Sequence, residues 1–391
     1  MATLENVVSV EYLISLRETR KKIPQYHIEG KPTEVEVIDR IGPALLGYDH
    51  VSRIAPHRAY RPLNRSKPEF TRAQVKDLHS RLSYELPVEC LDTTLDVNLE
   101  WWRKKELANC PFCPQNIATK TPEPRFYHEG LETNLGERVI SVPNISSAMG
   151  EHLVTVFGDH FIDLSQLTYR DMVNIFLSGY QIARDYKNHG AVGIHDFINF
   201  GKSAGGTKEH PHSQRGEIRD IDSFYRESEK ARIFRDLNGE GGKLMYQLIT
   251  YIRQSPLAIF ENDHIFIYAA WAPRYPHHIE VIFKNPNGPN AGNYLDFNRN
   301  DLEIAARSML GIFHALRGLE VTELNFALHQ SSFIGEQKSE PKDFRMQAEI
   351  IPTSGYVQGA LEKKKLYIIP TIPEITAAAI RDHYNQQISK H

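Results

Sequence analysis

Short apolar segments and one long amphipathic segment follow each other along the chain, and this order occurs twice. The first set predicts two strands, a helix and a strand, at residues 138–143, 152–158, 167–186 and 192–200. The second set predicts three strands, a helix and two strands, at residues 257–262, 264–270, 277–283, 301–316, 324–329 and 344–352. Two sets of similar order and size indicate two copies of one α+β unit.

We therefore expect an α+β fold with two similar halves, whose antiparallel sheets are flanked by helices. Residues 53–240 would form the first half, and residues 241–391 the second half with a closing helix from Pro373 onward. Residues 1–52 are charged and mixed in pattern, and we expect them to form an N-terminal extension.

The segment N-F-G-K-S-A-G-G-T-K-E-H-P-H-S-Q, residues 199–214, carries the strongest indication of chemistry. Gly201, Gly205 and Gly206 allow backbone amides to come close to an anion, which is typical of phosphate loops. The H-P-H sequence places His210 and His212 two positions apart, so on a strand their side chains would point the same way.

His212 is the candidate nucleophile, because an imidazole can attack phosphorus and carry a nucleotidyl group. The attack needs one ring nitrogen held by a hydrogen bond, which a carbonyl in the H-P-H turn could accept. Gln214, two residues further, could donate to a phosphate oxygen. An isolated H-x-H pair is more often two surface or core histidines, but the glycine loop and Gln214 favour phosphate chemistry.

Cys110 and Cys113 form a C-x-x-C pair, a spacing that suits one tetrahedral zinc ion. A redox pair or two buried thiols are equally consistent with this spacing. No further ligands follow Cys113 at zinc-finger distance. His160 and His210 are distant in sequence, but we expect both at strand edges near the candidate site, and the spacing suggests the hypothesis that they complete a Cys2His2 set. Such a zinc ion would be structural, because four protein ligands leave no position for substrate.

Two further groups are weaker indications. Arg58 and Arg61 could clamp a diphosphate through paired guanidinium contacts, although a solvated basic loop has the same pattern. A second divalent cation could bind to a mixed set of nitrogen and oxygen groups, and the simpler interpretation of that set is a polar cleft without metal. Its members are Glu227, Glu229, His329, Gln347 and Glu349.

Composition excludes several classes of protein. With 41% hydrophobic and 24% charged residues, the 391-residue chain has globular composition, and its net charge of −3 argues against nucleic acid as a partner. No apolar run is long enough to span a membrane, and the N-terminus lacks the form of a signal peptide. The three cysteines suit a reducing compartment. We expect a cytoplasmic protein whose partners are small molecules or a second copy of the chain.

From about Arg53 onward, these motifs resemble the galactose-1-phosphate uridylyltransferase family of the histidine-triad superfamily. The resemblance rests on P-H-R-A-Y-R-P, C-P-F-C-P-Q-N, G-D-H and the segment of residues 199–214. It implies two histidine-triad-like halves and a homodimer whose partner helps to close each site. It also implies that His212 is uridylylated, that Gln214 contacts the transferred phosphate, and that Cys110, Cys113, His160 and His210 bind zinc.

The resemblance also implies a nucleotide-binding surface. It places Asn144 near the base or ribose, and it assigns the phosphate loop to Asn199, Gly201, Gly205, Gly206 and Thr207. Where the family often has H-x-H, this chain has Gln347, Ala348 and Glu349, so a second metal site is in question. The sugar-side sequence departs from the family as well.

We therefore expect a nucleotide-sugar enzyme that moves a nucleotidyl group between a nucleotide sugar and a sugar 1-phosphate through a covalent His212 intermediate. The altered sugar side leaves three alternatives: a phosphorylase or hydrolase of nucleotide sugars, a mutase that converts a pyranose to a furanose, and a non-catalytic nucleotide-binding protein. No local motif specifies the base or the sugar.

Overall fold

The computed structural model describes residues 16–25, 33–42, 50–55, 109–147, 149–158, 160, 164–208, 210–237, 240–288, 291–334, 344–354 and 358–388. The chain divides into two compact units, residues 61–123 and the remainder. In the smaller unit, the described segment contains helix α4 (Pro114–Lys120), which begins directly after Cys113 with Pro114 in its first turn.

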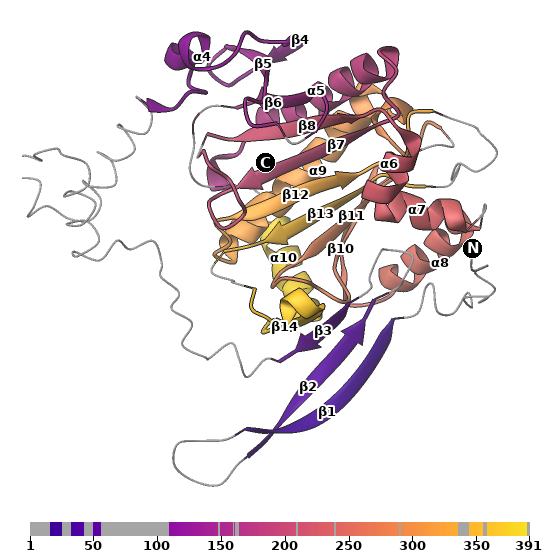
Figure 1. Ribbon diagram of the computed structural model, residues 1–391. Coiled ribbons are helices and arrows are strands. Elements are labelled where there is room, and N and C mark those ends of the chain that lie inside the picture. The colour runs from indigo at the N-terminus through magenta and orange to yellow at the C-terminus, as the bar shows by residue number, and fades with distance from the viewer. Residues whose placement is uncertain are drawn as a thin grey trace, which may run out of the picture. The chain divides into compact units, whose positions relative to one another are not determined.

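The larger unit is built on one ten-stranded antiparallel sheet with strand order β4-β5-β6-β8-β7-β12-β13-β11-β10-β9 (Figure 1). The first half supplies β4 (Phe126–Glu132), β5 (Arg138–Pro143), β6 (His152–Val156), β7 (Gly193–Phe200) and β8 (His212–Ile218). The second half supplies β9 (Ala258–Glu261), β10 (Ile265–Ala269), β11 (Ile279–Phe283), β12 (Leu324–His329) and β13 (Gln347–Pro352). The order of the second half mirrors that of the first, and β7 pairs with β12 where they meet.

The long helix of each half has the same length and the same ends. α5 (Tyr169–Asn188) and α9 (Arg299–Gly318) both have 20 residues, and each begins with a capping box, Thr168 with Asp171 and Asn298 with Asp301. The predicted α+β fold with two similar halves and antiparallel strands is confirmed. The predicted boundaries at residues 53 and 241 stay predictions.

Helices α5 and α9 pack against each other, and α10 (Pro373–Ile388) packs on α9 and on strands β9 and β10 (Figure 1). Residues that face these helices from the central strands are apolar and buried, among them Ile198 on β7 and Phe326 on β12. The opposite face of β7 and β12 carries half-buried residues such as Phe197 and Ala327. The sheet therefore has a core face and a more polar face.

Three shorter helices follow β8: α6 (Ile221–Glu227), α7 (Glu229–Asp236) and α8 (Gly241–Arg253). The remaining short elements are the 3-10 turns η4 (Leu164–Gln166), η5 (Tyr294–Asp296) and η6 (Glu362–Lys364). The hydrophobic pattern did not predict α6 to α8 or strand β4.

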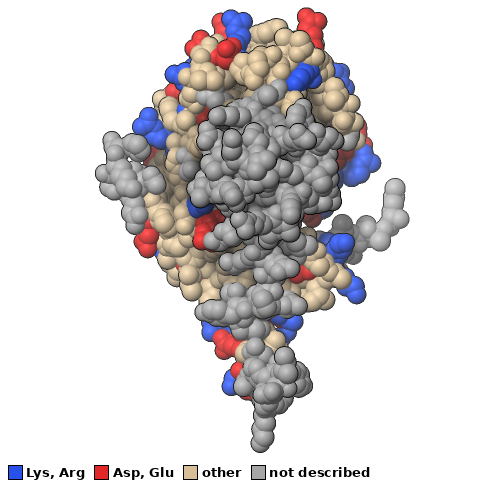
Figure 2. All heavy atoms as spheres, turned by 90° about the vertical axis from the view of Figure 1, so that its left-hand side faces the viewer, with Lys and Arg blue, Asp and Glu red and all other residues tan. Residues whose placement is uncertain are grey.

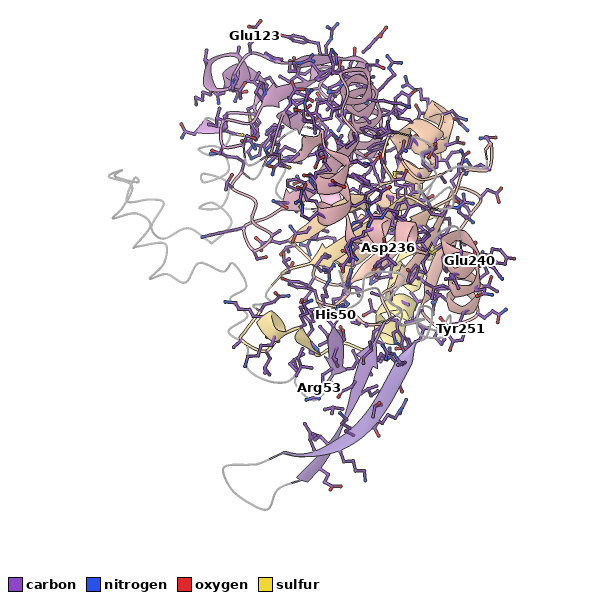
Figure 3. The ribbon with its side chains drawn as sticks, turned by 45° about the vertical axis from the view of Figure 1, so that its right-hand side comes forward. His50, Arg53, Glu123, Asp236, Glu240 and Tyr251 are labelled. Atoms are coloured by element: carbon purple, nitrogen blue, oxygen red, sulfur yellow. The ribbon has the colours of Figure 1, made fainter. Side chains whose placement is uncertain are left out.

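A second, four-stranded sheet has the order β1-β2-β3-β14, with β1 (Arg17–Gln25), β2 (Thr33–Ile41), β3 (Val51–Ile54) and β14 (Leu366–Ile369). Figure 3 labels two residues of this region. His50 Nε2 lies 2.8 Å from the Ala272 carbonyl, which joins the sheet to the segment after β10, and Arg53 forms an ion pair with Asp39 within the sheet. The described part of the expected N-terminal extension is thus paired with a C-terminal strand.

Basic and acidic side chains are interspersed over the described part of the face in Figure 2. Among the helices that the structure describes, none combines the length and apolar character needed to cross a bilayer.

Candidate active site

His212 is the first residue of β8, and its side chain is only 6% exposed. Its Nδ1 lies 2.9 Å from the His210 carbonyl oxygen, so Nδ1–H donates this bond and the lone pair of the neutral ring is on Nε2. Burial lowers the pKa of His212, which this hydrogen bond only partly opposes. The ring is therefore neutral at pH 7, as a nucleophile for phosphorus requires.

His210 differs from the expectation that both histidines share one strand. It lies in the turn before β8, because Pro211 separates it from His212 and has no N–H to give to the β-ladder. His210 Nε2 is 2.9 Å from the Gly158 carbonyl, and its ring centroid is 5.2 Å from that of His160. Burial lowers the pKa of His210 to about 4, so both rings of this pair are positioned as neutral imidazoles.

Gln214 lies two residues beyond His212 on β8, on the same side of the sheet. The structure brings Asn144 to it: Asn144 Nδ2 is 3.4 Å from Gln214 Oε1, and it also contacts the His152 ring at 3.3 Å. Two amide side chains therefore meet beside the candidate nucleophile, where each can donate hydrogen bonds to phosphate or nucleotide oxygens.

The loop after β7 is tightly folded on itself. Gly201 and Gly205 have φ values of +89° and +85°, which favour glycine, and the Gly206 amide donates to the Gly201 carbonyl at 2.9 Å. Asn199, at the start of the loop, accepts a 2.9 Å bond from Asn325 on β12. The glycines thus shape the loop, while Thr207 is exposed beyond it.

An internal anion already occupies two amides of this loop. The Glu323 carboxylate accepts hydrogen bonds from the amides of Lys202 and Ser203 at 2.9 and 3.0 Å. Two amides of the loop thus bind an anion that belongs to the protein itself, and the binding of a phosphate by this loop stays a prediction.

Cys110 and Cys113 are both buried, and the Asn116 side chain donates to the Cys110 carbonyl at 2.9 Å. Burial, reinforced by the neighbouring Cys110, raises the pKa of the Cys113 thiol to about 12. A cation between the two sulfurs would reverse this shift, since thiolates are stabilised by metal. The structure thus shows two neighbouring cysteines that are buried as neutral thiols.

The candidate second-cation group is only partly brought together. His329 pairs with Gln347 across β12 and β13, and its Nε2 is 3.6 Å from Glu349. Glu227 instead contacts His195 at 2.8 Å beside a cleft of about 270 Å³, and Glu229 pairs with Arg232.

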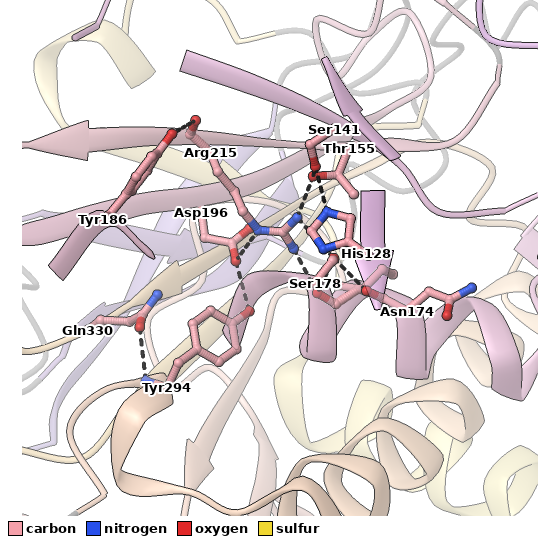
Figure 4. A network of polar contacts seen from close by, with 11 residues as sticks. His128, Ser141, Thr155, Asn174, Ser178, Tyr186, Asp196, Arg215, Tyr294 and Gln330 are labelled. Atoms are coloured by element: carbon pink, nitrogen blue, oxygen red, sulfur yellow. Dashed lines mark hydrogen bonds and ion pairs between the residues drawn. The ribbon is translucent and has the colours of Figure 1, made fainter. Parts of the chain in front are cut away.

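On the core face of β8 lies a buried network that the sequence did not reveal (Figure 4). Arg215 Nε is 3.0 Å from Asp196 Oδ2, and the Tyr294 hydroxyl donates to the same oxygen at 2.8 Å. Arg215 also bonds to Thr155 at 2.8 Å. Arg215 lies next to Gln214 on β8. Since Thr155 belongs to β6 and Asp196 to β7, the network fixes β8 against both neighbouring strands. Arg58 and Arg61, expected to clamp a diphosphate, lie outside the described residues.

The fold and this candidate site define a class: an α+β protein with two mirrored halves in one sheet and an H-P-H turn that leads into strand β8. Neither a protein-family model nor a curated protein sequence matches the chain. Several solved structures share its fold. An ADP-glucose phosphorylase from Arabidopsis thaliana with bound ADP-glucose has a TM-score of 0.59 and 16% identity, covering 85% of this chain and 95% of its own.

A GalT-like protein from Arabidopsis thaliana has a TM-score of 0.56 and 18% identity, over 70% of this chain and 91% of its own. A uridylyltransferase has a TM-score of 0.53 and 18% identity, over 68% of this chain and 94% of its own. The resemblance noted from the motifs is confirmed at the level of the fold.

Proposed function

We propose that this protein is an enzyme that transfers a nucleotidyl group from a nucleotide sugar through a covalent intermediate on His212. The observation that carries the proposal is the hydrogen bond from His212 Nδ1 to the His210 carbonyl, which leaves the ring lone pair on Nε2. The shared fold with a uridylyltransferase and an ADP-glucose phosphorylase supports the substrate class.

The reaction has two displacements at one phosphorus. His212 Nε2 attacks the α-phosphorus, the bond from this phosphorus to the bridging oxygen breaks, and a sugar 1-phosphate leaves with the electron pair. An oxygen of the acceptor then attacks the same phosphorus, and the phosphorus–nitrogen bond breaks to restore neutral His212. Gln214 and Asn144 donate hydrogen bonds to the phosphate or nucleotide oxygens during both steps.

We also propose that Cys110, Cys113, His160 and His210 hold one structural zinc ion. Two thiols and two neutral imidazoles are a common donor set for tetrahedral zinc. The His210 Nε2–H bond to Gly158 would orient the ring so that Nδ1 is the ligand, in the way that outer hydrogen bonds usually fix zinc-bound histidines. Zinc would therefore fix the turn that ends at His212.

The remaining substrate contacts are proposals from the motif resemblance. Arg58 and Arg61 would bind the diphosphate, and Thr207 with the loop of Asn199, Gly201, Gly205 and Gly206 would border the phosphates. A homodimer would complete each site.

The central experiment is mass spectrometry of the intact protein after incubation with single UDP-, ADP- and GDP-sugars and no acceptor. We expect a mass increase of one nucleotidyl group, that is a nucleoside monophosphate less one water, on His212. The increase should be absent in His212→Asn and present in His189→Asn, an exposed histidine used as the matched control. No adduct with any nucleotide sugar, together with normal turnover of His212→Asn, would refute the proposal.

Adding acceptors to the isolated adduct then separates the outcomes. Release of a nucleotide sugar by a sugar 1-phosphate identifies a transferase. Release of a nucleoside diphosphate by inorganic phosphate identifies a phosphorylase, which the TM-score of 0.59 to the ADP-glucose phosphorylase favours as the second candidate. A changed sugar that is still attached to its nucleotide identifies a mutase and contradicts the transferase proposal.

A further inference from the structure

In the second half, two buried carboxylates lie side by side on the polar face of the sheet. Glu280 on β11 pairs with Glu349 on β13, and they are 0% and 5% exposed. One ligand atom from each, with one from buried His278, lie within 4.8 Å of one another. Two carboxylates and an imidazole at this separation would suit a divalent cation.

A lysine ammonium, however, already lies between these carboxylates. Lys230 on α7 is 4% exposed, and its Nζ is 3.2 Å from Glu280 Oε2 and 3.0 Å from Glu349 Oε1. Arg274 forms an ion pair with the other oxygen of Glu349. Two carboxylates thus face two cations, and the cluster is neutral without any added ion.

The pKa shifts of Lys230 and Glu349 keep both groups in their charged forms. Burial alone would lower the pKa of Lys230, but Glu280 and Glu349 outweigh it and the pKa is raised. The pKa of Glu349 is held well below its usual value because Lys230 and Arg274 overcome the effect of burial. Burial lowers the pKa of His278 to about 3, so this ring stays neutral and adds no charge.

The carboxylate Glu349 of this cluster lies at the position in the second half that Gln214 has in the first half. β13 begins at Gln347 where β8 begins at His212, so Glu349 takes the place of Gln214. Strand pairing places both on the same face, since Gln214 pairs with Phe197, and Ala327 pairs with both Phe197 and Glu349. Their backbones are three strand spacings apart, about 14 Å.

We propose that Lys230 is a built-in cation that takes the position of a second metal ion, and that helix α7 thereby closes the counterpart of the active site in the second half. A divalent cation needs carboxylate oxygens at about 2.0–2.6 Å, a space that the ammonium group fills. Adding two positive charges beside Lys230 and Arg274 would also be repulsive. This inference does not depend on the proposed nucleotidyl transfer.

A metal count provides the first test. The wild-type protein, loaded with excess Zn²⁺ and Mn²⁺ and then desalted, should retain no metal that depends on the carboxylate pair, so Glu280→Gln should hold as much as wild type. The proposed zinc should be lost in Cys113→Ser. A metal that persists in Cys113→Ser but disappears in Glu280→Gln would overturn the inference.

Thermal unfolding of lysine variants provides the second test. Lys230→Met leaves buried carboxylate charge uncompensated and should lower Tm by roughly 4–6 °C, whereas Lys243→Met, at an exposed position of α8, should leave it nearly unchanged. If Lys230→Met does not fold, the Lys230→Met/Glu280→Gln double variant should recover folded protein. Equal Tm values for the two single variants, or no recovery by the double variant, would contradict the inference.

Mn²⁺ titration of Lys230→Ala provides the sharpest test. Removing the ammonium leaves two carboxylates and an imidazole around a space of suitable size, so Mn²⁺ should raise the Tm of Lys230→Ala and not that of wild type. Equal Mn²⁺ shifts in the two proteins would overturn the proposed replacement of metal by Lys230.

Discussion

Strands β8 and β13 take the same place in the two halves of the sheet, but they carry different chemistry. β8 begins with His212 and presents Gln214 beside Asn144. β13 begins with Gln347 and presents Glu349, which is held in an ion cluster with Lys230. The first strand thus presents neutral groups that can accept and donate hydrogen bonds at a phosphate. The second presents charges that are already neutralised inside the protein.

The supporting helices do not share this difference. α5 and α9 have equal lengths and matching caps, and a residue with positive φ lies two positions beyond the end of each, Gly190 and Glu320. The duplicated scaffold has therefore kept its backbone geometry while its side chains at the equivalent strands diverged. Packing constrains the core face, and the polar face is where chemistry can change.

The largest expected effect separates the two strands by function. His212→Ala should lower turnover by on the order of 10⁴-fold or more, because it removes the proposed nucleophile. Gln347→Ala, at the equivalent position, should change turnover by less than about threefold. Steady-state kinetics with the nucleotide sugar found by the adduct screen checks both variants, and comparable losses would show that the halves share the chemistry.

The next largest effect is on the free energy of unfolding, and it comes from the buried side chains on the core face of β8 and β13. Arg215→Met leaves Asp196 buried without its cation and should lower the free energy of unfolding by about 3–5 kcal/mol. At the equivalent position of β13, Ile350→Val removes only one methylene and should cost about 1 kcal/mol. Urea denaturation measures both. The Arg215→Met/Asp196→Asn double variant should regain part of the loss, and a double variant no better than the single one would contradict this account.

Each half also contains a histidine that is buried in its neutral form. Burial lowers the pKa of His128 to about 4 and that of His278 to about 3, from 6.5 in the unfolded chain. As the pH falls below 6.5, only the unfolded state takes up these protons, so the stability that each provides is lost. Between pH 7 and pH 5, each should account for about 2 kcal/mol of the decline.

Urea denaturation of His128→Gln and His278→Gln at both pH values checks this prediction, because each variant should show a shallower decline than wild type. His128 is held by Gln181 and Ser141 at 2.9 and 2.8 Å. A decline as steep as that of wild type would mean that the replaced histidine is protonated in the folded protein.

The smallest changes in the free energy of unfolding are expected at the residues that follow α5 and α9. The Cβ of an alanine at Gly190 would meet no atom within 4 Å, so Gly190→Ala should cost only the backbone strain of φ +86°, about 1 kcal/mol. Glu320 has a φ of 63°, and Glu320→Gly should raise the free energy of unfolding by up to about 1 kcal/mol. Chemical denaturation should give shifts of opposite sign; shifts of the same sign would contradict the equivalence of the two ends.

Much of the sheet and both long helices could be predicted from the sequence, because their apolar positions follow the periods of strands and helices. The residues near His212 could also be selected, since glycines, Gln214 and the H-P-H turn occur within one short segment. The turn geometry of His210 was missed because it depends on a distant carbonyl, that of Gly158.

Lys230 shows why the buried charged residues could not be predicted from the sequence. In the charged run of α7 a lysine has the pattern of a solvent-facing residue. Its burial depends on carboxylates contributed by two distant strands, and no local period records such a pairing. Arg215 is similar, because its partner Asp196 lies on another strand. Buried ion pairs are long-range features, and sequence periodicity describes only local ones.

The junction between β7 and β12 has a consequence for how the chain can be divided. Phe197 pairs with Ala327 there, and Asn325 also bonds to Asn199 through its side chain. Cut apart, each half would present one of these strands as an open edge, which favours aggregation. Joining the halves in one chain supplies each edge with its partner at a millimolar effective concentration. The second half would then remain necessary even without a catalytic role, because it protects the open edge of the first half.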